Sequence, residues 1–197
     1  MYKRQEGDEV IIPTPCWVSY IEMVKLSGAT PVLVQNREED GFALNVEGIK
    51  KAITSKTKAI MINTPNNPTG AVYTKEQLTE LAELACKHDF YIISDEVYEK
   101  LIYEGKKHFC VASISEEVKD RTVVINGVSK AYSMTGWRVG YAAGNAALIK
   151  GMTSLQGHTT SNTCSIAQYA ALEAISGPQD SVCLLYTSDA ADDMQCV

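Results

Sequence analysis

The residue types with the clearest chemical use lie in the segment NGVSKAYSMTGWRVGY, at residues 126–141. Lys130 stands between two β-rich runs, and Arg138 follows it by eight residues. A lysine amine can condense with a carbonyl to form an imine, and a guanidinium can bind a phosphate through two parallel hydrogen bonds. The pair therefore predicts a site for a ligand that carries both a carbonyl and a phosphate.

Polar residues also follow two other β-rich runs. Asn67 comes shortly after the apolar run AIMIN, and Asp95 ends the run FYIIS, just as Lys130 follows TVVIN. In parallel α/β sheets, ligands bind outside the carboxyl ends of the strands. We therefore expect Asn67, Asp95 and Lys130 to converge on one rim of a sheet.

Each of these residues also has an ordinary structural interpretation. A lone lysine is usually a solvated surface charge, and NNPTG at residues 66–70 is a turn-forming sequence. Asp95 alone fits a helix N-cap, and Trp17 alone fits a core aromatic. Their combination in one chain favours a binding site.

Strand-like and helix-like segments alternate along most of the chain. This alternation predicts an α/β fold with a mainly parallel sheet and flanking helices. The apolar-periodic stretch Ser19–Leu26 is predicted to be a helix, and helical stretches are expected from Ala146 to about Ile175. The predicted strands are Val10–Pro13, Pro31–Gln35, Ala59–Asn63, Phe90–Ser94, Thr122–Asn126 and Trp137–Gly144.

The clearest helix signal begins at Thr74. Gln77 stands three residues later, which completes the pattern of a capping box. Apolar residues then recur at helical spacing, and Lys87 and His88 close the segment, where cations suit the helix dipole. We predict a helix from this cap to about His88.

Composition places the chain among folded proteins. Apolar residues make up 45% of it and charged residues 21%, close to the average for globular domains. Lysine and arginine number 18 against 24 aspartates and glutamates, so the net charge is −6, and there is no basic run. This balance argues against a nucleic-acid or anionic-membrane partner, and no apolar run is long enough for a membrane span. We therefore expect a soluble, cytoplasmic protein.

The cysteines and histidines show no ligand spacing. None of the six cysteines forms a C-x-x-C pair, so reduced, partly buried thiols are expected. His88, His108 and His158 are interpreted as surface or helix-end residues. No metal site is predicted.

Both ends of the chain differ in character from the rest. MYKRQ at residues 1–5 and CLLYTSDAADD within residues 183–197 break the periodicity of their neighbours and resemble translated adaptor sequence. We interpret both as non-native tails, with natural flexible ends as the alternative. Residues 6–182 are then expected to form one partial large domain.

Four motifs in order resemble the fold-type I aminotransferases of class I, in particular their bacterial aspartate aminotransferase branch. One motif is the lysine segment already described. The others are PTPCWVSYIEMVKLSGATPV at residues 13–32, NTPNNPTGAVY at 63–73 and SDEVYEKLIYEG at 94–105. The resemblance covers about residues 7–178, and it implies the large pyridoxal-phosphate-binding domain of that fold, incomplete here.

The resemblance assigns the reacting groups. Lys130 is implied to hold pyridoxal phosphate as a Schiff base and, once freed by substrate, to move the proton between the substrate and the cofactor. Asp95 is implied to face the ring nitrogen and keep it protonated, so that the ring can accept electrons. Tyr98 is implied to donate to the phenolic oxygen of the ring.

The same resemblance assigns the groups that hold cofactor and substrate. Asn67 is implied to bind the phenolic oxygen and approach the substrate carboxylate, and Trp17 to stack on the ring and line the substrate site. Arg138 is implied to pair with the phosphate. Ser129 and Asn126 are further, weaker phosphate candidates. The family often carries a phosphate-binding serine three residues before the lysine, and this chain has Gly127 there.

The implied function is transfer of an amino group between an amino acid and a 2-oxo acid. An aspartate-like donor is favoured by the resemblance alone. Aromatic, alanine or kynurenine transaminases and β-lyases use the same rim and remain alternatives. So do a pyridoxal-phosphate-binding regulatory domain and an inert truncated product.

Chains of this family are much longer, which implies that some anchors are missing. A glycine-rich phosphate-binding turn is expected before residue 1, and an arginine for the substrate carboxylate after residue 182. The family usually forms homodimers, so we expect one for the full-length protein. We expect little or no transaminase activity from this chain alone.

Overall fold

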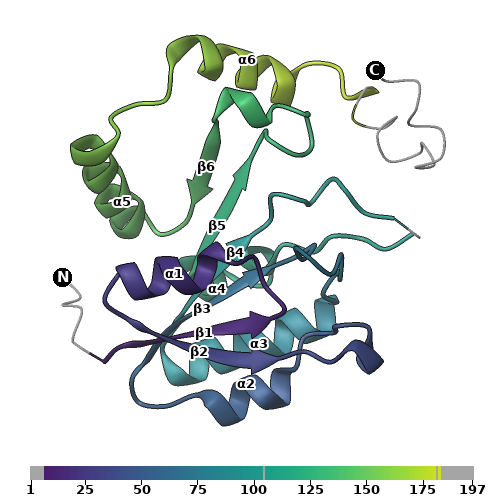
Figure 1. Cartoon of the computed structure of the whole chain (residues 1–197), viewed down its shortest axis with the longest axis vertical. Coiled ribbons are helices and arrows are strands. Elements are labelled where there is room, and N and C mark those ends of the chain that lie inside the picture. Colours follow the sequence, from purple (N-terminus) through teal and green to yellow (C-terminus); the bar gives the residue numbers. More distant parts are fainter. Residues whose placement is uncertain (1–6, 104, 181, 183–197) are drawn as a thin grey trace.

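One sheet runs through the described part of the chain, residues 7–103, 105–180 and 182 of the computed structural model (Figure 1). Its strands are β1 (Glu9–Thr14), β2 (Thr30–Gln35), β3 (Thr57–Asn63), β4 (Tyr91–Asp95), β5 (Thr122–Gly127) and β6 (Gly140–Ala143). Their order is β2-β1-β3-β4-β5-β6. Neighbours from β2 through β5 pair in parallel, whereas β5 and β6 are antiparallel. The predicted mainly parallel α/β sheet is therefore confirmed.

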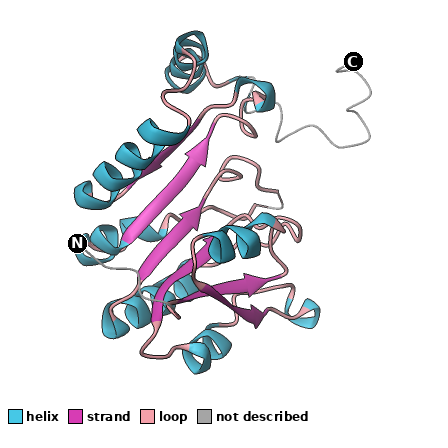
Figure 2. Ribbon diagram, turned by 60° about the vertical axis from the view of Figure 1, so that its left-hand side comes forward, coloured by secondary structure: helices cyan, strands magenta, loops and turns pink. Residues whose placement is uncertain are grey.

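Helices cover both faces of the sheet (Figure 2). They are α1 (Ser19–Leu26), α2 (Val46–Ala52), α3 (Lys75–His88), α4 (Glu116–Arg121), α5 (Ala146–Thr159) and α6 (Ser165–Ser176), with 3-10 turns η1 (Glu38–Asp40), η2 (Val111–Ser113) and η3 (Thr135–Trp137). The short helices α2 and α4 were not among the predicted elements.

Alternation along β1 separates two apolar cores, because successive side chains of a strand point to opposite faces. Val10 and Ile12 pack with Tyr20 of α1 on one face. Ile11 packs on the other face with α2 and α3, where Leu78 is fully buried. The central strands are thus covered on both sides, as their continuous apolar runs require.

The capping signal of α3 is confirmed. The Thr74 hydroxyl accepts a hydrogen bond from the Gln77 amide N–H at 3.3 Å, and the Gln77 side chain accepts one from the Thr74 amide at 2.9 Å. Asp89 ends the helix in the left-handed conformation. Leu78, Leu81, Ala82 and Ala85 form its buried stripe.

The prediction of one strand over Trp137–Gly144 was wrong at its start. Trp137 lies in η3, and Arg138 adopts φ 56°, in the left-handed region. A strand cannot continue through such a residue, so β6 begins only at Gly140. The aromatic and β-branched residues before that point resemble a strand in sequence alone.

The C-terminal helices bury little. No side chain of α5 is buried, and α6 buries only Ala167 and Ala171. Figure 1 shows both helices beyond β5 and β6, away from α2 and α3. The predicted helical content of this region is confirmed.

Two further predictions concern membrane-spanning helices and the two ends of the chain. Among the helices that the structure describes, none is both long and apolar enough to cross a membrane. The predicted tails, residues 1–5 and 183–197, lie outside the described residues.

Candidate active site

The carboxyl ends of the central strands open into one cavity of about 420 Å³. Asn67, Asp95 and Lys130 all line it, so the predicted convergence on one rim is confirmed. The cavity contains every residue that the sequence singled out for the site: Trp17, Asn67, Asp95, Tyr98, Lys130 and Arg138. Ser129 and Asn126 line it as well.

Strand register places Asp95 at the centre of this rim. Asn63 at the end of β3 pairs with Asp95 at the end of β4. The Asn63 side chain and the Thr64 amide both donate to the Asp95 carbonyl oxygen, at 3.0 and 3.1 Å. The backbone that carries the carboxylate is therefore held by its neighbouring strand.

The Asp95 carboxylate itself is held at both oxygens. Oδ1 accepts the Val97 amide N–H at 3.1 Å, and Oδ2 accepts the Tyr20 hydroxyl at 2.5 Å. Tyr20 is only 5% exposed. Burial, and then the neighbouring Asp95 carboxylate, raise the pKa of the Tyr20 phenol.

Asn67 and Tyr98 form a second hydrogen-bonded unit beside Lys130. The Asn67 amide donates to the Asn63 side-chain oxygen at 2.7 Å, which fixes the turn after β3. The Asn67 side chain donates to the Tyr98 hydroxyl at 3.3 Å. The Lys130 ammonium lies 5.6 Å from the centre of the Tyr98 ring. An amine, a phenol and an amide thus share one wall of the cavity.

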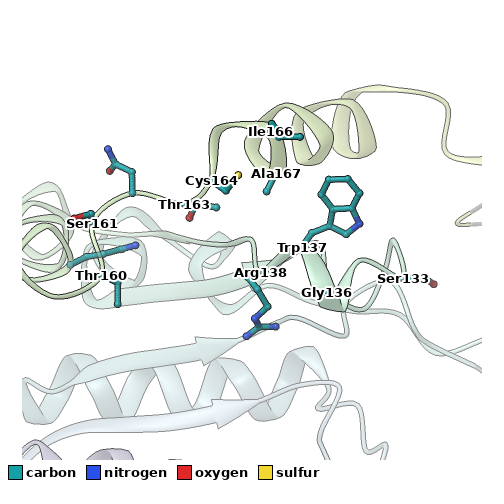
Figure 3. A pocket seen from close by; sticks show the side chains of 12 residues that line it. Ser133, Gly136, Trp137, Arg138, Thr160, Ser161, Thr163, Cys164, Ile166 and Ala167 are labelled. Atoms are coloured by element: carbon teal, nitrogen blue, oxygen red, sulfur yellow. The ribbon is translucent and has the colours of Figure 1, made fainter.

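Trp17 and Arg138 are the more exposed members of the set. Trp17, just before α1, is 40% exposed and meets the Tyr20 ring edge to face, with centroids 5.4 Å apart and planes at 88°. Arg138 donates to the nearby Thr135 carbonyl at 2.9 Å. Its left-handed backbone turns it away from Trp137 (Figure 3), which points towards Ala167 of α6 while Arg138 points towards the strands.

A wider cavity of about 800 Å³ lies on the other side of this turn. Arg138, in the connection between β5 and β6, lines both cavities. The larger cavity otherwise holds few groups able to do chemistry, with Cys164 as the one thiol in its lining (Figure 3). The reactive residue types therefore belong to the smaller cavity.

The space around Gly127 is too small for the serine that the family often carries at this position. A Cβ atom built there lies 2.9 Å from the Val139 carbonyl oxygen and 3.2 Å from Gly140 Cα. The backbone entering β6 occupies that space, so a serine would require the strand to shift. Ser129 and Asn126, the two weaker candidates, do line the cavity, as do Lys130, Thr135 and Arg138 of the same loop.

The prediction for His108 was wrong. His108 is a partly buried residue whose Nε2 lies 2.8 Å from Glu96 Oε2, and Glu96 is 2% exposed. The other Glu96 oxygen accepts the Ser94 hydroxyl at 2.9 Å. Glu99 offers a third possible metal ligand within 4.8 Å, but both Glu96 oxygens already have hydrogen-bond partners. His88 and His158 lie in the last turns of α3 and α5, as predicted.

With this geometry in place, comparison with known proteins identifies the family. The sequence profile of "Aminotransferase class I and II" matches residues 1–192. The chain belongs to this family. The sequence resemblance is therefore confirmed, and so is the aminotransferase fold.

Similar proteins carry several substrate names. The chain is 59% identical to an aspartate aminotransferase of Bacillus sp. (strain YM-2) over 90% of its own length and 45% of that protein's. It is 49% identical to an asparagine–oxo-acid transaminase of Streptococcus mutans over 89% of its length and 44% of the other. An aromatic aminotransferase from Pyrococcus horikoshii has a similar structure, with a TM-score of 0.89 at 43% identity over 92% of this chain and 49% of that one. The chain thus spans a little under half the length of its relatives.

Sequence reasoning missed Tyr20, which lines the cavity. Tyr20 entered only as part of a helical stretch, although it lies one helical turn after Trp17. Sequence reasoning also gave no role to Glu96, which bonds to Ser94 and His108 and is not among the residues that line the cavity. The signal for Tyr20 was its spacing, since residues three apart share one helix face.

Proposed function

We propose that this chain is the cofactor-binding part of a pyridoxal-phosphate-dependent aminotransferase. The observation that carries the proposal is the single cavity lined by Lys130, Asp95 and Arg138. Family membership supports the same chemistry. The domain assigned from the sequence, residues 6–182, is proposed to be an incomplete large domain.

The lining residues fit each part of pyridoxal phosphate. Lys130 offers an amine for the aldehyde, Asp95 a carboxylate for the ring nitrogen, and Arg138 a guanidinium for the phosphate. Tyr98 and Asn67 offer donors for the phenolic oxygen. Trp17 offers a flat face for the ring. A cavity of about 420 Å³ is within the range of cofactor sites.

When bound, pyridoxal phosphate supplies a ring that accepts electrons from the substrate. Lys130 Nζ, lying beside the Tyr98 ring, would take the proton from the substrate α-carbon and deliver it to the cofactor, and would move it in the opposite direction for the 2-oxo acid. Asp95, held at both oxygens, would keep its carboxylate directed at the ring nitrogen and hold a proton there.

The remaining residues bind and orient. Asn67 and Tyr98, already hydrogen-bonded to each other, would present their donors together. Trp17 would cover the ring and exclude water, and with Asn67 it would border the substrate. The exposed Arg138 would pair with the phosphate.

The proposed substrates are an amino acid and a 2-oxo acid. An aspartate-like donor is favoured because relatives named aspartate aminotransferase are among the most similar, such as the Bacillus sp. protein at 59% identity. Relatives named for asparagine and aromatic substrates keep the donor open. A homodimer and a cytoplasmic location, both expected from the sequence, belong to the same proposal for the full-length protein.

Absorbance tests the cofactor site directly. We expect the chain to keep an absorption band after pyridoxal phosphate is added and the unbound cofactor is removed by gel filtration, because the Lys130 amine condenses with its aldehyde. The band should be lost in Lys130→Ala and kept in Lys150→Ala, which removes an exposed amine of α5. A band that survives in Lys130→Ala, or none in the unmodified chain, would refute the site.

Turnover tests the expectation for the isolated chain. We expect little or no exchange between aspartate and 2-oxoglutarate, because the chain spans under half the length of its relatives. Coupled detection of the product oxaloacetate measures it, with the Lys130→Ala chain as the background. Turnover clearly above that background would contradict the expectation.

A further inference from the structure

Tyr20 touches two of the groups that the proposed function uses, although neither the family resemblance nor the proposed function assigns it a role. Its hydroxyl donates to Asp95, and its ring meets Trp17. We propose that Tyr20 is a positioning residue, which fixes the Asp95 carboxylate and the Trp17 indole relative to each other. This inference rests on the proposed function.

The hydroxyl determines how the carboxylate is oriented. The Tyr20 hydroxyl occupies Oδ2 at 2.5 Å and the Val97 amide occupies Oδ1 at 3.1 Å. With both oxygens held from different elements, the carboxylate cannot rotate freely. Each carboxylate oxygen has two acceptor positions, so one remains available for a ring N–H.

Tyr20 is suited to act as a permanent donor. Burial and the adjacent Asp95 raise the pKa of the Tyr20 phenol, so the hydroxyl keeps its proton throughout the physiological range. The hydrogen in this bond therefore comes from Tyr20, and Asp95 remains the acceptor. A carboxylate that only accepts is what a protonated ring nitrogen requires.

The ring of Tyr20 connects this bond to the sheet. Tyr20 packs with Val10, Ile12 and Val24 in the apolar core between α1 and the strands. Its edge-to-face contact at 5.4 Å supports Trp17, which is itself 40% exposed. One buried side chain, packed against the sheet, thus holds both Asp95, proposed to meet the ring nitrogen, and Trp17, proposed to stack on the ring.

Tyr73 provides a matched control. It is 1% exposed, and its hydroxyl is also hydrogen-bonded, accepting from Asn36 at 3.2 Å. It does not line the cavity that contains Asp95. Tyr73→Phe therefore removes a buried hydroxyl of the same kind without disturbing the site.

The experiment compares pyridoxal phosphate binding by the unmodified chain, Tyr20→Phe and Tyr73→Phe. Tyr20→Phe keeps the ring against Trp17 and removes only the donor. We expect its dissociation constant, measured by absorbance titration, to rise about tenfold, since hydrogen bonds to charged groups are among the strong ones. Tyr73→Phe should stay within about twofold. Tyr20→Leu, which also removes the aromatic contact, should bind more weakly than Tyr20→Phe.

A second readout separates positioning from mere stability. The visible band of the lysine-bound cofactor changes with pH, and its midpoint should rise in Tyr20→Phe but not in Tyr73→Phe. The reason is that a poorly placed Asp95 leaves the ring nitrogen less protonated. With less positive charge on the ring, the imine nitrogen formed with Lys130 is protonated more easily, so its pKa rises. Circular dichroism melting of the cofactor-free chains verifies that both variants fold.

The outcomes distinguish the two levels of the proposal. If the unmodified chain does not bind the cofactor, the proposed function fails and this inference fails with it. If it binds, and Tyr20→Phe matches Tyr73→Phe in both affinity and midpoint, the positioning role is overturned while the proposed function stands. A loss of affinity and a raised midpoint confined to the Tyr20 variants would support the role.

Discussion

Residues 9–121, the N-terminal part, bury apolar cores on both faces of the sheet, whereas residues 140–176, the C-terminal part, bury almost nothing. Ile11, Ile60 and Ile92 at the centre of the sheet are completely buried. In contrast, α5 and α6 expose most of their large apolar side chains: Met152, Leu155, Ile166, Tyr169, Leu172 and Ile175. The same chain therefore contains a packed region and a region that lies open.

This difference extends to the proposed active site. Asp95 and Asn67 belong to the packed part, where hydrogen bonds to Asn63 of β3 fix both, and the Val97 amide and Tyr20 of α1 hold the Asp95 carboxylate. Arg138 stands at the entrance to the open part, is exposed, and bonds to Thr135 within its own turn. The side of the site that would face the ring nitrogen is thus preorganised, while the phosphate side depends on a segment with little packing.

The largest effect should come from removing core volume. Ile60→Ala in β3 should lower the free energy of unfolding by about 2–5 kcal/mol, through lost burial and a cavity. Ile166→Ala on α6 should change it by less than about 0.5 kcal/mol, because that side chain is 73% exposed. Urea denaturation of the two variants measures both values. Similar losses in the two would show that α6 is packed after all.

A smaller effect should follow from breaking the contact between His108 and the buried Glu96. His108→Ala leaves one oxygen of the 2%-exposed Glu96 without its partner, which should cost about 1–3 kcal/mol. The control is Thr153→Ala on α5, whose exposed hydroxyl bonds the Ile149 carbonyl of its own helix. That change should cost less than about 0.5 kcal/mol. Thermal melts that do not separate the two variants would argue against a stabilising Glu96–His108 contact.

The fold was largely predictable because its strands are continuous apolar runs. β3 and β5 begin or end within two residues of the predicted bounds, and the Thr74 cap located α3. The short helices α2 and α4 escaped, since six or seven residues give too little periodicity to detect. The false start of β6 at Trp137 came from strand-like residues in a turn.

The candidate site was predictable where residue type alone suggests chemistry. Lys130, Asp95 and Arg138 stood out as an amine, an acid and a phosphate-binding cation near strand ends. The contacts that fix them did not, because Tyr20 and Asp95 are 75 residues apart and meet only through the strand order. A local sequence pattern cannot indicate a contact between residues so far apart in the chain. A buried Glu96–His108 contact across a loop is hidden for the same reason.

The smallest effect that we predict concerns thiol reactivity in the two parts. Burial, and then the neighbouring Glu96 carboxylate, raise the pKa of the Cys110 thiol to about 11. Cys164, at the start of α6, is exposed, unlike the partly buried thiols expected from the sequence. Because the thiolate is the reactive form, iodoacetamide at mildly alkaline pH should modify Cys110 at least about tenfold more slowly than Cys164.

Peptide mass spectrometry after timed labelling measures the two rates separately, and labelling in urea provides the control in which both thiols should react alike. The rates should converge as the pH is raised towards the pKa of Cys110, because its thiolate then becomes abundant. That convergence separates an ionisation effect from simple steric protection, which would persist at every pH at which the chain stays folded. Equal rates in the native chain at mildly alkaline pH would mean that the loop after β4 is as open as α6, and the contrast between the two parts would not extend to the residues around Glu96.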